Sequence, residues 1–194
     1  MAGLGLVVVV ALGVAGFQAL QSPDLGAIGY IEYPVARPVA FDAWAITDHR
    51  GQAVTAAALA GRWSIVFFGF TYCPDVCPVT LSVLNRAIAD LPEPPRVMLV
   101  SLDPKRDTPA RLGDYLAAFN PDYVGLTGRA RDIQNLADAL GMAFVRIPGL
   151  TRGDYSYDHA IDLVVLDPSA AHAGYIKTQD PEALRQIFQS LAGR

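Results

Sequence analysis

The segment that most constrains the fold of this chain is an apolar run that leads directly into two cysteines. Ser64 to Phe70 reads SIVFFGF, a nearly continuous series of β-branched and aromatic residues. Such a run is typical of a strand that is covered on both faces in a parallel or mixed sheet. The sequence TYCPDVCP follows at once, over residues 71–78. Both cysteines are therefore predicted to lie where a buried strand ends and a helix begins.

The rest of the chain predicts alternating strands and helices. Residues 41–47 alternate as a half-buried peripheral strand does, and residues 97–102 form a second buried run, after which Asp107-Thr108-Pro109 predicts a helix cap. Further along we predict a helix closed by Gly141, a strand at 143–147, a polar loop at 151–158, strands at 161–166 and 174–178 with a turn at 167–173 between them, and an amphipathic C-terminal helix. The order βαβα followed by ββα is that of a thioredoxin-like α/β fold, with a mixed central sheet flanked by helices.

The amino-terminal segment predicts a membrane location. Leu4 to Leu20 carries no charge, and Gln18 is its one strongly polar residue. We interpret residues 1–21 as a membrane anchor or signal segment, with an uncleaved anchor favoured, residues 22–38 as a tether, and residues 39–194 as one exported domain. The net charge of −4 and the absence of a Lys/Arg cluster in the sequence argue against nucleic acid as a partner.

Cys73 and Cys77 are placed as reactive thiols or metal ligands. Helix N-termini at the carboxyl ends of strands lower thiol pKa values, so both sulfurs are predicted to be reactive. Cysteines four apart at a helix start lie on one face, and side-chain rotation can bring their sulfurs to the about 4 Å that a shared metal requires. A disulfide stays open, because Pro74 and Pro78 allow the helix to begin only at Pro78, with the cysteines in a tight loop.

Two thiolates do not close a metal site, and the chain offers three histidines. His49, in an Asp-His-Arg-Gly turn, and His172, in an Ala-His-Ala-Gly turn, are predicted to be solvated turn residues. His159 precedes the strand IDLVVL, and in a thioredoxin-like fold the loop entering that strand faces the cysteines. Two thiolates and one imidazole suit Cu(I), and also Cu(II) with an added weak ligand. Structural zinc would need a fourth protein ligand, while catalytic zinc with water stays an alternative.

Three blocks of sequence resemble the SCO/SenC family, in its order and spacing, over roughly Val39 to the C-terminus. They are TYCPDVCP, VSLDPKRDTP and YDHAIDLVVLDP, which begin at residues 71, 100 and 157. The resemblance implies an inner-membrane protein that faces the periplasm or intermembrane space and binds one copper ion through Cys73, Cys77 and His159. It also implies a role in assembling the dinuclear copper centre of cytochrome c oxidase subunit II, with a copper donor protein as a possible second partner.

The same resemblance makes Asp75 and Asp158 candidates for orienting the ligands. Asp103 and Arg106 to Pro109, in the second block, are interpreted as a loop and a helix cap. The segment Pro168 to His172 departs from the tighter Asp-Gly type of turn expected there.

The leading functional prediction is a copper chaperone that catalyses no reaction. The alternative is a thiol-disulfide oxidoreductase that uses Cys73 and Cys77 to reduce the cysteines of the recipient. A peroxide-reducing redoxin would need a Thr or Arg at the thiolate, for which Thr71 is the nearby candidate.

Overall fold

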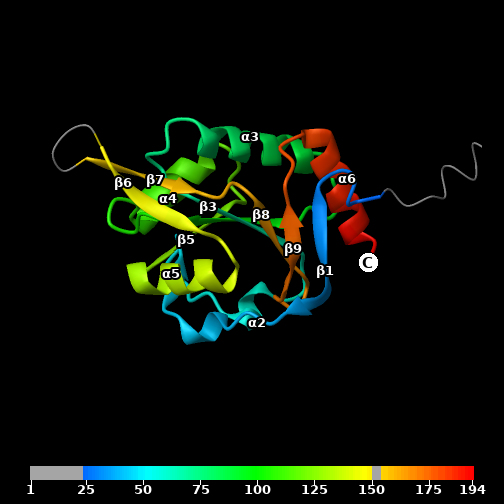
Figure 1. The fold of residues 1–194 in the computed structure, drawn as a ribbon, viewed down its shortest axis with the longest axis horizontal. Coiled ribbons are helices and arrows are strands. Elements are labelled where there is room, and N and C mark those ends of the chain that lie inside the picture. The colour runs from blue at the N-terminus through cyan, green and yellow to red at the C-terminus, as the bar shows by residue number, and fades with distance from the viewer. Residues whose placement is uncertain (1–23, 150–153) are drawn as a thin grey trace, which may run out of the picture.

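The computed structural model describes residues 24–149 and 154–194, and its centre is a seven-stranded sheet (Figure 1). In spatial order the strands are β1 (Tyr30–Arg37), β9 (His172–Ile176), β8 (Leu163–Leu166), β3 (Ser64–Gly69), β4 (Arg96–Ser101), β5 (Val124–Gly128) and β2 (Ile46–Asp48). β3, β4 and β5 run parallel, and every other neighbouring pair is antiparallel. This is the predicted mixed sheet.

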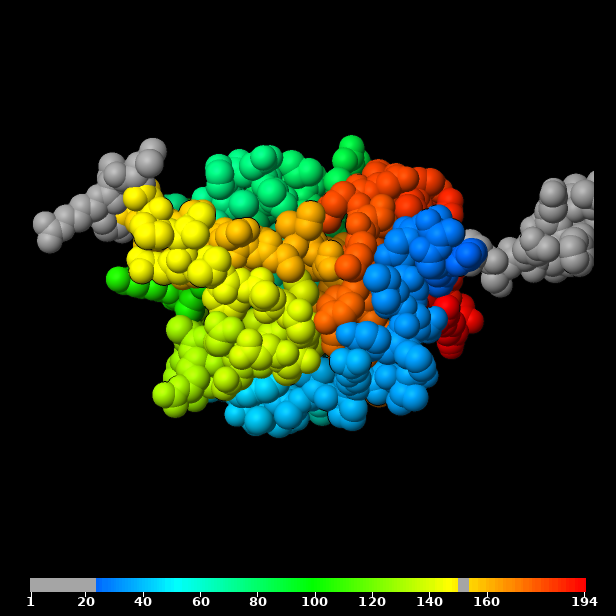
Figure 2. Space-filling model, viewed as in Figure 1, coloured from blue at the N-terminus to red at the C-terminus, as the bar shows by residue number. Residues whose placement is uncertain are grey.

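Helices cover both faces of the sheet, and a separate hairpin lies at one end. The helices are η1 (Phe41–Ala43), α2 (Ala56–Leu59), α3 (Val76–Ile88), α4 (Pro109–Ala117), α5 (Ala130–Ala139) and α6 (Pro181–Ala192). The hairpin pairs β6 (Phe144–Pro148) with β7 (Tyr155–His159). In Figures 1 and 2 this hairpin lies at the end of the domain opposite β1 and α6.

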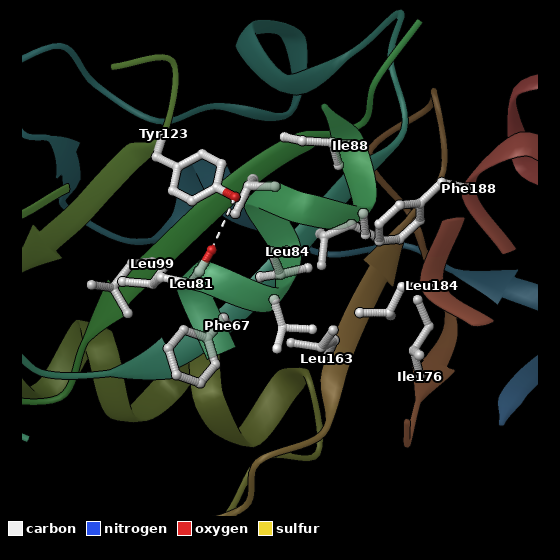
Figure 3. Packing of buried hydrophobic residues seen from close by; sticks show 14 of the residues in the cluster. Phe67, Leu81, Leu84, Ile88, Leu99, Tyr123, Leu163, Ile176, Leu184 and Phe188 are labelled. Atoms are coloured by element: carbon white, nitrogen blue, oxygen red, sulfur yellow. Dashed lines mark hydrogen bonds between the residues drawn. The ribbon is translucent and has the colours of Figure 1, made fainter. Parts of the chain in front are cut away.

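The sheet divides the apolar core in two because successive strand residues point to opposite faces. Phe67 of β3 packs in the core under α3, α4 and α6, whereas Phe68 packs in the core under α5 and α2. Figure 3 shows the first core, in which Leu84 of α3 and Leu184 of α6 lie among the strand residues. The strand that precedes the cysteines is thereby buried over its whole length.

Several predicted elements are confirmed with small shifts. α4 begins at Pro109, with Thr108 as the cap that accepts a hydrogen bond from the Arg111 amide. Gly141 follows α5 with φ of +65°, a left-handed conformation in which glycine carries no Cβ penalty. α3 begins at Val76, earlier than the Pro78 start that was considered, and Pro78 is tolerated because first-turn amides have no helical partner.

Other predictions were wrong. Residues 41–43 form a 3-10 helix, and the strand that follows, β2, pairs with β5 at the sheet edge. β5 itself was not predicted, because VGLTG has two glycines and little apolar character. The loop predicted at 151–158 is wrong over residues 155–158, which belong to β7 and pair with β6; residues 151–153 lie outside the described residues.

The amino-terminal predictions have a mixed outcome. The tether assigned to residues 22–38 is incorrect over residues 30–37, which form β1 and pair with β9. The segment at residues 1–21 lies outside the described residues. Among the helices of residues 24–149 and 154–194, none is long and apolar enough to cross a membrane.

Candidate metal centre

The two cysteines lie where β3 is followed by α3; Cys73 is partly exposed and Cys77 is buried. Cys73 is half-buried, and its amide donates to the Phe70 carbonyl over 3.2 Å. Cys77 is fully buried in the first turn of α3, and its amide donates to Cys73 Sγ over 3.4 Å. Both are free thiols. A partner molecule can therefore reach Cys73 first, with Cys77 directly behind it.

Cys77 is packed tightly against the end of β3. A Cβ atom built on Gly69 would lie 3.0 Å from Cys77 Sγ and 3.1 Å from a methyl group of Leu99. Burial raises the pKa of the Cys77 thiol well above its usual range, with a smaller contribution from its hydrogen bond with Cys73. The prediction that the helix N-terminus lowers the pKa of both thiols is wrong for Cys77, because loss of solvent outweighs the helix.

His159 approaches the buried thiol from the hairpin. It is the last residue of β7 and pairs with Phe144, and its Nε2 lies 4.0 Å from Cys77 Sγ. Its Nδ1 lies 2.9 Å from the carbonyl oxygen of Ala160. Because a carbonyl can only accept, Nδ1 carries the proton and the lone pair of Nε2 faces the sulfur. The structure thus brings together two of the three residues that were predicted to bind copper.

The sulfur–nitrogen separation suits a shared metal ion. With bonds of about 2.3 Å to sulfur and 2.0 Å to nitrogen, as for zinc, and an opening of about 120°, the two donors would be about 3.7 Å apart. The observed 4.0 Å between Cys77 Sγ and His159 Nε2 is close to this value. Within residues 24–149 and 154–194, no three His, Cys, Asp or Glu side chains already converge as a complete metal-binding group. The third predicted donor, Cys73 Sγ, accepts a hydrogen bond from the Cys77 amide.

Asp75 and Asp158 are both exposed, and no hydrogen bond of either side chain is found in the part of the chain described. Asp75 precedes α3 without capping it through its side chain. Asp158 precedes His159 on β7, and successive strand residues point to opposite faces. Neither carboxylate therefore contacts the three candidate ligands through a hydrogen bond.

The second sequence block forms a polar clamp that was not predicted. Asp107 is fully buried and accepts three hydrogen bonds, from the Thr71 amide over 2.9 Å, the Thr71 hydroxyl over 2.6 Å and the Ser101 hydroxyl over 2.7 Å. Asp103, also fully buried, pairs with Arg106 and accepts from the Tyr155 hydroxyl over 2.9 Å. One loop thus holds both the cysteine turn and the strand that carries His159.

The clamp corrects the interpretation of this block as only a loop and a cap. Thr108 does cap α4. Asp103 and Asp107, however, also follow a buried strand, at the edge of the sheet where functional sites form. Their position in the sequence could have indicated a role at the site. The clamp also removes Thr71 as a peroxide-site candidate, because its hydroxyl is already bonded to Asp107 and accepts from Arg111 Nε over 2.7 Å.

The other two histidines lie away from the cysteines. His49 is in the predicted turn but is half-buried, and its Nδ1 accepts from the Gly125 amide over 3.0 Å. The prediction for His172 was wrong: it begins β9, is 1% exposed, and stacks edge-on against Tyr33 and Tyr175. Antiparallel pairing with Arg37 of β1 covers this strand, which explains the burial.

Comparison with known proteins gives consistent matches. The SCO1/SenC family model matches residues 37–192. A protein from Stutzerimonas stutzeri is 40% identical over 136 residues, which is 68% of this chain and 66% of that protein. Protein sco1 of Schizosaccharomyces pombe is 32% identical over 143 residues, 69% of this chain and 53% of that protein. The chain therefore spans about half to two thirds of the length of these relatives.

Solved structures give the same result. ScoI of Bradyrhizobium japonicum with copper bound matches with a TM-score of 0.66 and 30% identity, over 76% of this chain and 96% of that chain. Yeast Sco1 with copper bound matches with a TM-score of 0.68 and 28% identity, over 78% of this chain and 87% of that one. The chain thus shares its fold with two proteins whose structures were solved with copper bound.

Proposed function

The chain belongs to the SCO1/SenC family, and on this premise we propose that it is a copper-binding metallochaperone. Its cargo is one copper ion per chain, held by Cys73, Cys77 and His159. Its recipient is subunit II of cytochrome c oxidase, whose dinuclear copper centre it helps to assemble. The copper-bound ScoI and Sco1 structures that the chain resembles support copper as the metal.

One observation carries the ligand assignment: the unprotonated Nε2 of His159 faces Cys77 Sγ at 4.0 Å. In the copper-free chain this lone pair accepts the S–H of Cys77, and loss of that proton would leave two donor atoms directed at one position. Two sulfurs and one imidazole form a soft three-coordinate set, which favours Cu(I) over zinc. Zinc stays the competing metal in the experiment below.

Transfer of the ion follows from the uneven exposure of the ligands. A thiolate of the recipient attacks the copper from the open side of the turn, next to Cys73. His159 leaves first, because a single neutral imidazole is the weakest of the three donors. The two thiolates are then exchanged one at a time, so the metal keeps at least two donors throughout.

A thiol-disulfide oxidoreductase is the second candidate, and the hydrogen bond from the Cys77 amide to Cys73 Sγ favours it. That bond holds the accessible sulfur next to the buried cysteine. The thiolate of Cys73 would attack a disulfide of the recipient, and Cys77 would then attack the mixed disulfide. The chain would end with a Cys73–Cys77 disulfide, and the recipient would gain two electrons and two protons as a pair of thiols.

The proposed location is the inner membrane, with residues 1–21 as a single anchor and the domain in the periplasm or intermembrane space. A copper donor protein would load the site there. The uncharged run from Leu4 to Leu20 supports this placement.

The ligand assignment is tested by titrating the reduced chain with Cu(I) against a competing chelator, and separately with Zn(II). The expected result is one Cu(I) per chain, bound more tightly than zinc. His159→Ala should weaken Cu(I) binding at least about tenfold, or about 1.4 kcal/mol. His49→Ala is the matched control, because it also removes a half-buried imidazole but at the far sheet edge.

Undiminished copper binding by His159→Ala would show that His159 is not a ligand. The redox candidate is tested separately, by mixing the copper-free chain with a peptide that contains an oxidised cysteine pair. Release of thiols that needs both Cys73 and Cys77 would support the oxidoreductase.

A further inference from the structure

Five side chains from separate segments stack into one row beside the cysteine turn. The row runs Arg111, Tyr72, Arg106, Tyr155, Arg146, and we refer to it as the cation–π ladder. The guanidinium carbons of Arg111 and Arg106 lie 4.2 and 4.6 Å from the centre of the Tyr72 ring. Those of Arg106 and Arg146 lie 3.7 and 3.8 Å from the centre of the Tyr155 ring. Each ring therefore contacts two cations, which places three positive charges in one line.

Most of this charge has no acidic partner. Arg106 pairs with Asp103, but among the ion pairs of the described residues none includes Arg111 or Arg146. Lys105, next to the ladder, is exposed and also without an ion pair there. The sequence shows no basic cluster and a net charge of −4. The fold nevertheless assembles one from residues 105–146, so its basic character is local.

The ladder adjoins the entrance to the site. Tyr72 directly precedes Cys73 and is 50% exposed. A groove of about 330 Å³ lies along the other end of the ladder, and its walls include Lys105, Phe144, Arg146, Tyr155, Tyr157 and the buried Asp103, whose charge Arg106 pairs. Val76 and Val79 of α3 are both exposed and lie within two residues of Cys77. A molecule that reaches Cys73 thus meets the positive charge of the ladder beside it.

We propose that the cation–π ladder and its groove dock an acidic protein segment, which brings the thiolates that receive copper. This inference rests on the proposed function and adds the charge of the recipient surface. Guanidinium groups recognise carboxylates in a planar, often bidentate way, and Arg clusters are a recurring means of binding acidic motifs. A recipient with two free thiolates is itself anionic, so the ladder attracts the same molecule that the metal site must meet.

A protein segment is favoured over a membrane surface by position. The ladder lies at the end of the domain formed by α4, β6 and β7, whereas β1, the first described strand, lies at the opposite end (Figures 1 and 2). A hollow lined by aromatic side chains also fits a chain segment better than a flat layer of headgroups.

The test compares two fluorescent peptides with the copper-free full chain, reduced and kept in nonionic detergent. Both peptides contain one Cys-x-x-x-Cys pair, flanked by four glutamates in one and by four glutamines in the other. The double variant Lys105→Gln, Arg146→Gln removes two exposed charges and leaves Arg106 and Arg111 in place. The control Arg50→Gln, Lys177→Gln removes the same charge from exposed positions that lie outside the ladder and its groove.

The acidic peptide should bind the parent chain at least about fivefold more tightly than the neutral one at low salt, and the difference should shrink as salt rises. The Lys105, Arg146 double variant should lose most of this difference, and the control should keep it. Equal binding of both peptides, or an unchanged preference in the double variant, would overturn the proposal. So would binding of phosphatidylglycerol vesicles, measured after the detergent is removed, that depends on the same two residues while the peptide preference does not. Because no copper is present, these outcomes are independent of whether the chain is a copper chaperone.

Discussion

Replacing Asp107 by alanine tests whether the loop after β4, which carries none of the proposed copper ligands, fixes the position of the cysteine turn. The carboxylate is fully buried and accepts from one amide and two hydroxyls, those of Thr71 and Ser101. Alanine would leave three buried donors without their acceptor, at about 1 kcal/mol or more for each. The two hydroxyls can rotate toward other acceptors, but the Thr71 amide cannot. The expected loss in the free energy of unfolding is therefore about 3 to 5 kcal/mol.

Copper binding should weaken as well, through geometry rather than loss of a ligand. The Thr71 amide lies two residues before Cys73, so its hydrogen bond fixes the start of the turn. Partners that orient ligands are typically worth about 10-fold to 100-fold in metal affinity, and we expect Asp107→Ala to fall within that range. Asp107→Asn keeps one acceptor oxygen and should lose about half as much stability.

The assays are urea denaturation followed by circular dichroism, and Cu(I) competition with a chelator on the folded protein. Asp114→Ala is the matched control, because Asp114 is exposed on α4 and its side chain makes no hydrogen bond with the described residues. If Asp107→Ala loses less than about 1 kcal/mol and binds Cu(I) like the parent, the three hydrogen bonds do not hold the cysteine turn.

Three further predictions follow from individual contacts. Burial raises the pKa of the Cys77 thiol, so Cu(I) must displace the proton of that thiol when it binds. Near neutrality this displacement should raise the apparent Cu(I) affinity by up to about tenfold per pH unit. A Cu(I) affinity that does not change with pH in chelator competition would contradict this prediction. Burial lowers the pKa of His172, so the unfolded chain takes up a proton at a higher pH than the folded chain does. The free energy of unfolding should therefore fall as the pH drops below about 6.5. In urea denaturation, His172→Phe should lack this pH dependence, whereas His49→Gln should retain it. Tyr155→Phe removes a hydrogen bond to a buried carboxylate and should cost about 1.5 kcal/mol in urea denaturation and weaken Cu(I) binding, whereas Tyr72→Phe, at an exposed ring, should change stability by less than about 0.5 kcal/mol.

The sequence predicted those parts of the site that depend on local pattern. An apolar run followed by a cysteine pair is visible within residues 64–78, and it predicts both the strand and the turn. The cap at Thr108 and the end of α5 at Gly141 are also local, because each depends on a few adjacent residues. These predictions succeeded because no distant contact overrides them.

The parts that failed depend on long-range pairing. β1 is a strand because it pairs with the edge of β9. The same pairing covers His172 of β9, which is therefore buried. Likewise β7 forms against β6, although its sequence is polar. Composition alone cannot show which strand edge a segment will meet, and this limited both the tether and the loop predictions. The cation–π ladder was even less predictable from the sequence, because its five residues are spread over residues 72–155 and meet only in the folded chain.

The way His159 is held bears on how the metal is released. The β6–β7 pair is a separate two-stranded sheet, and such hairpins are only marginally stable alone. Its attachment to the domain includes the Tyr157 ring, which contacts Phe70 at 5.5 Å, and the Tyr155 hydroxyl bonded to Asp103. The cysteines, by contrast, lie between a fully buried strand and the longest helix among the described residues. Of the three proposed copper ligands, the His159 imidazole is thus both the weakest donor and the one on the less firmly packed element, and we expect it to leave first.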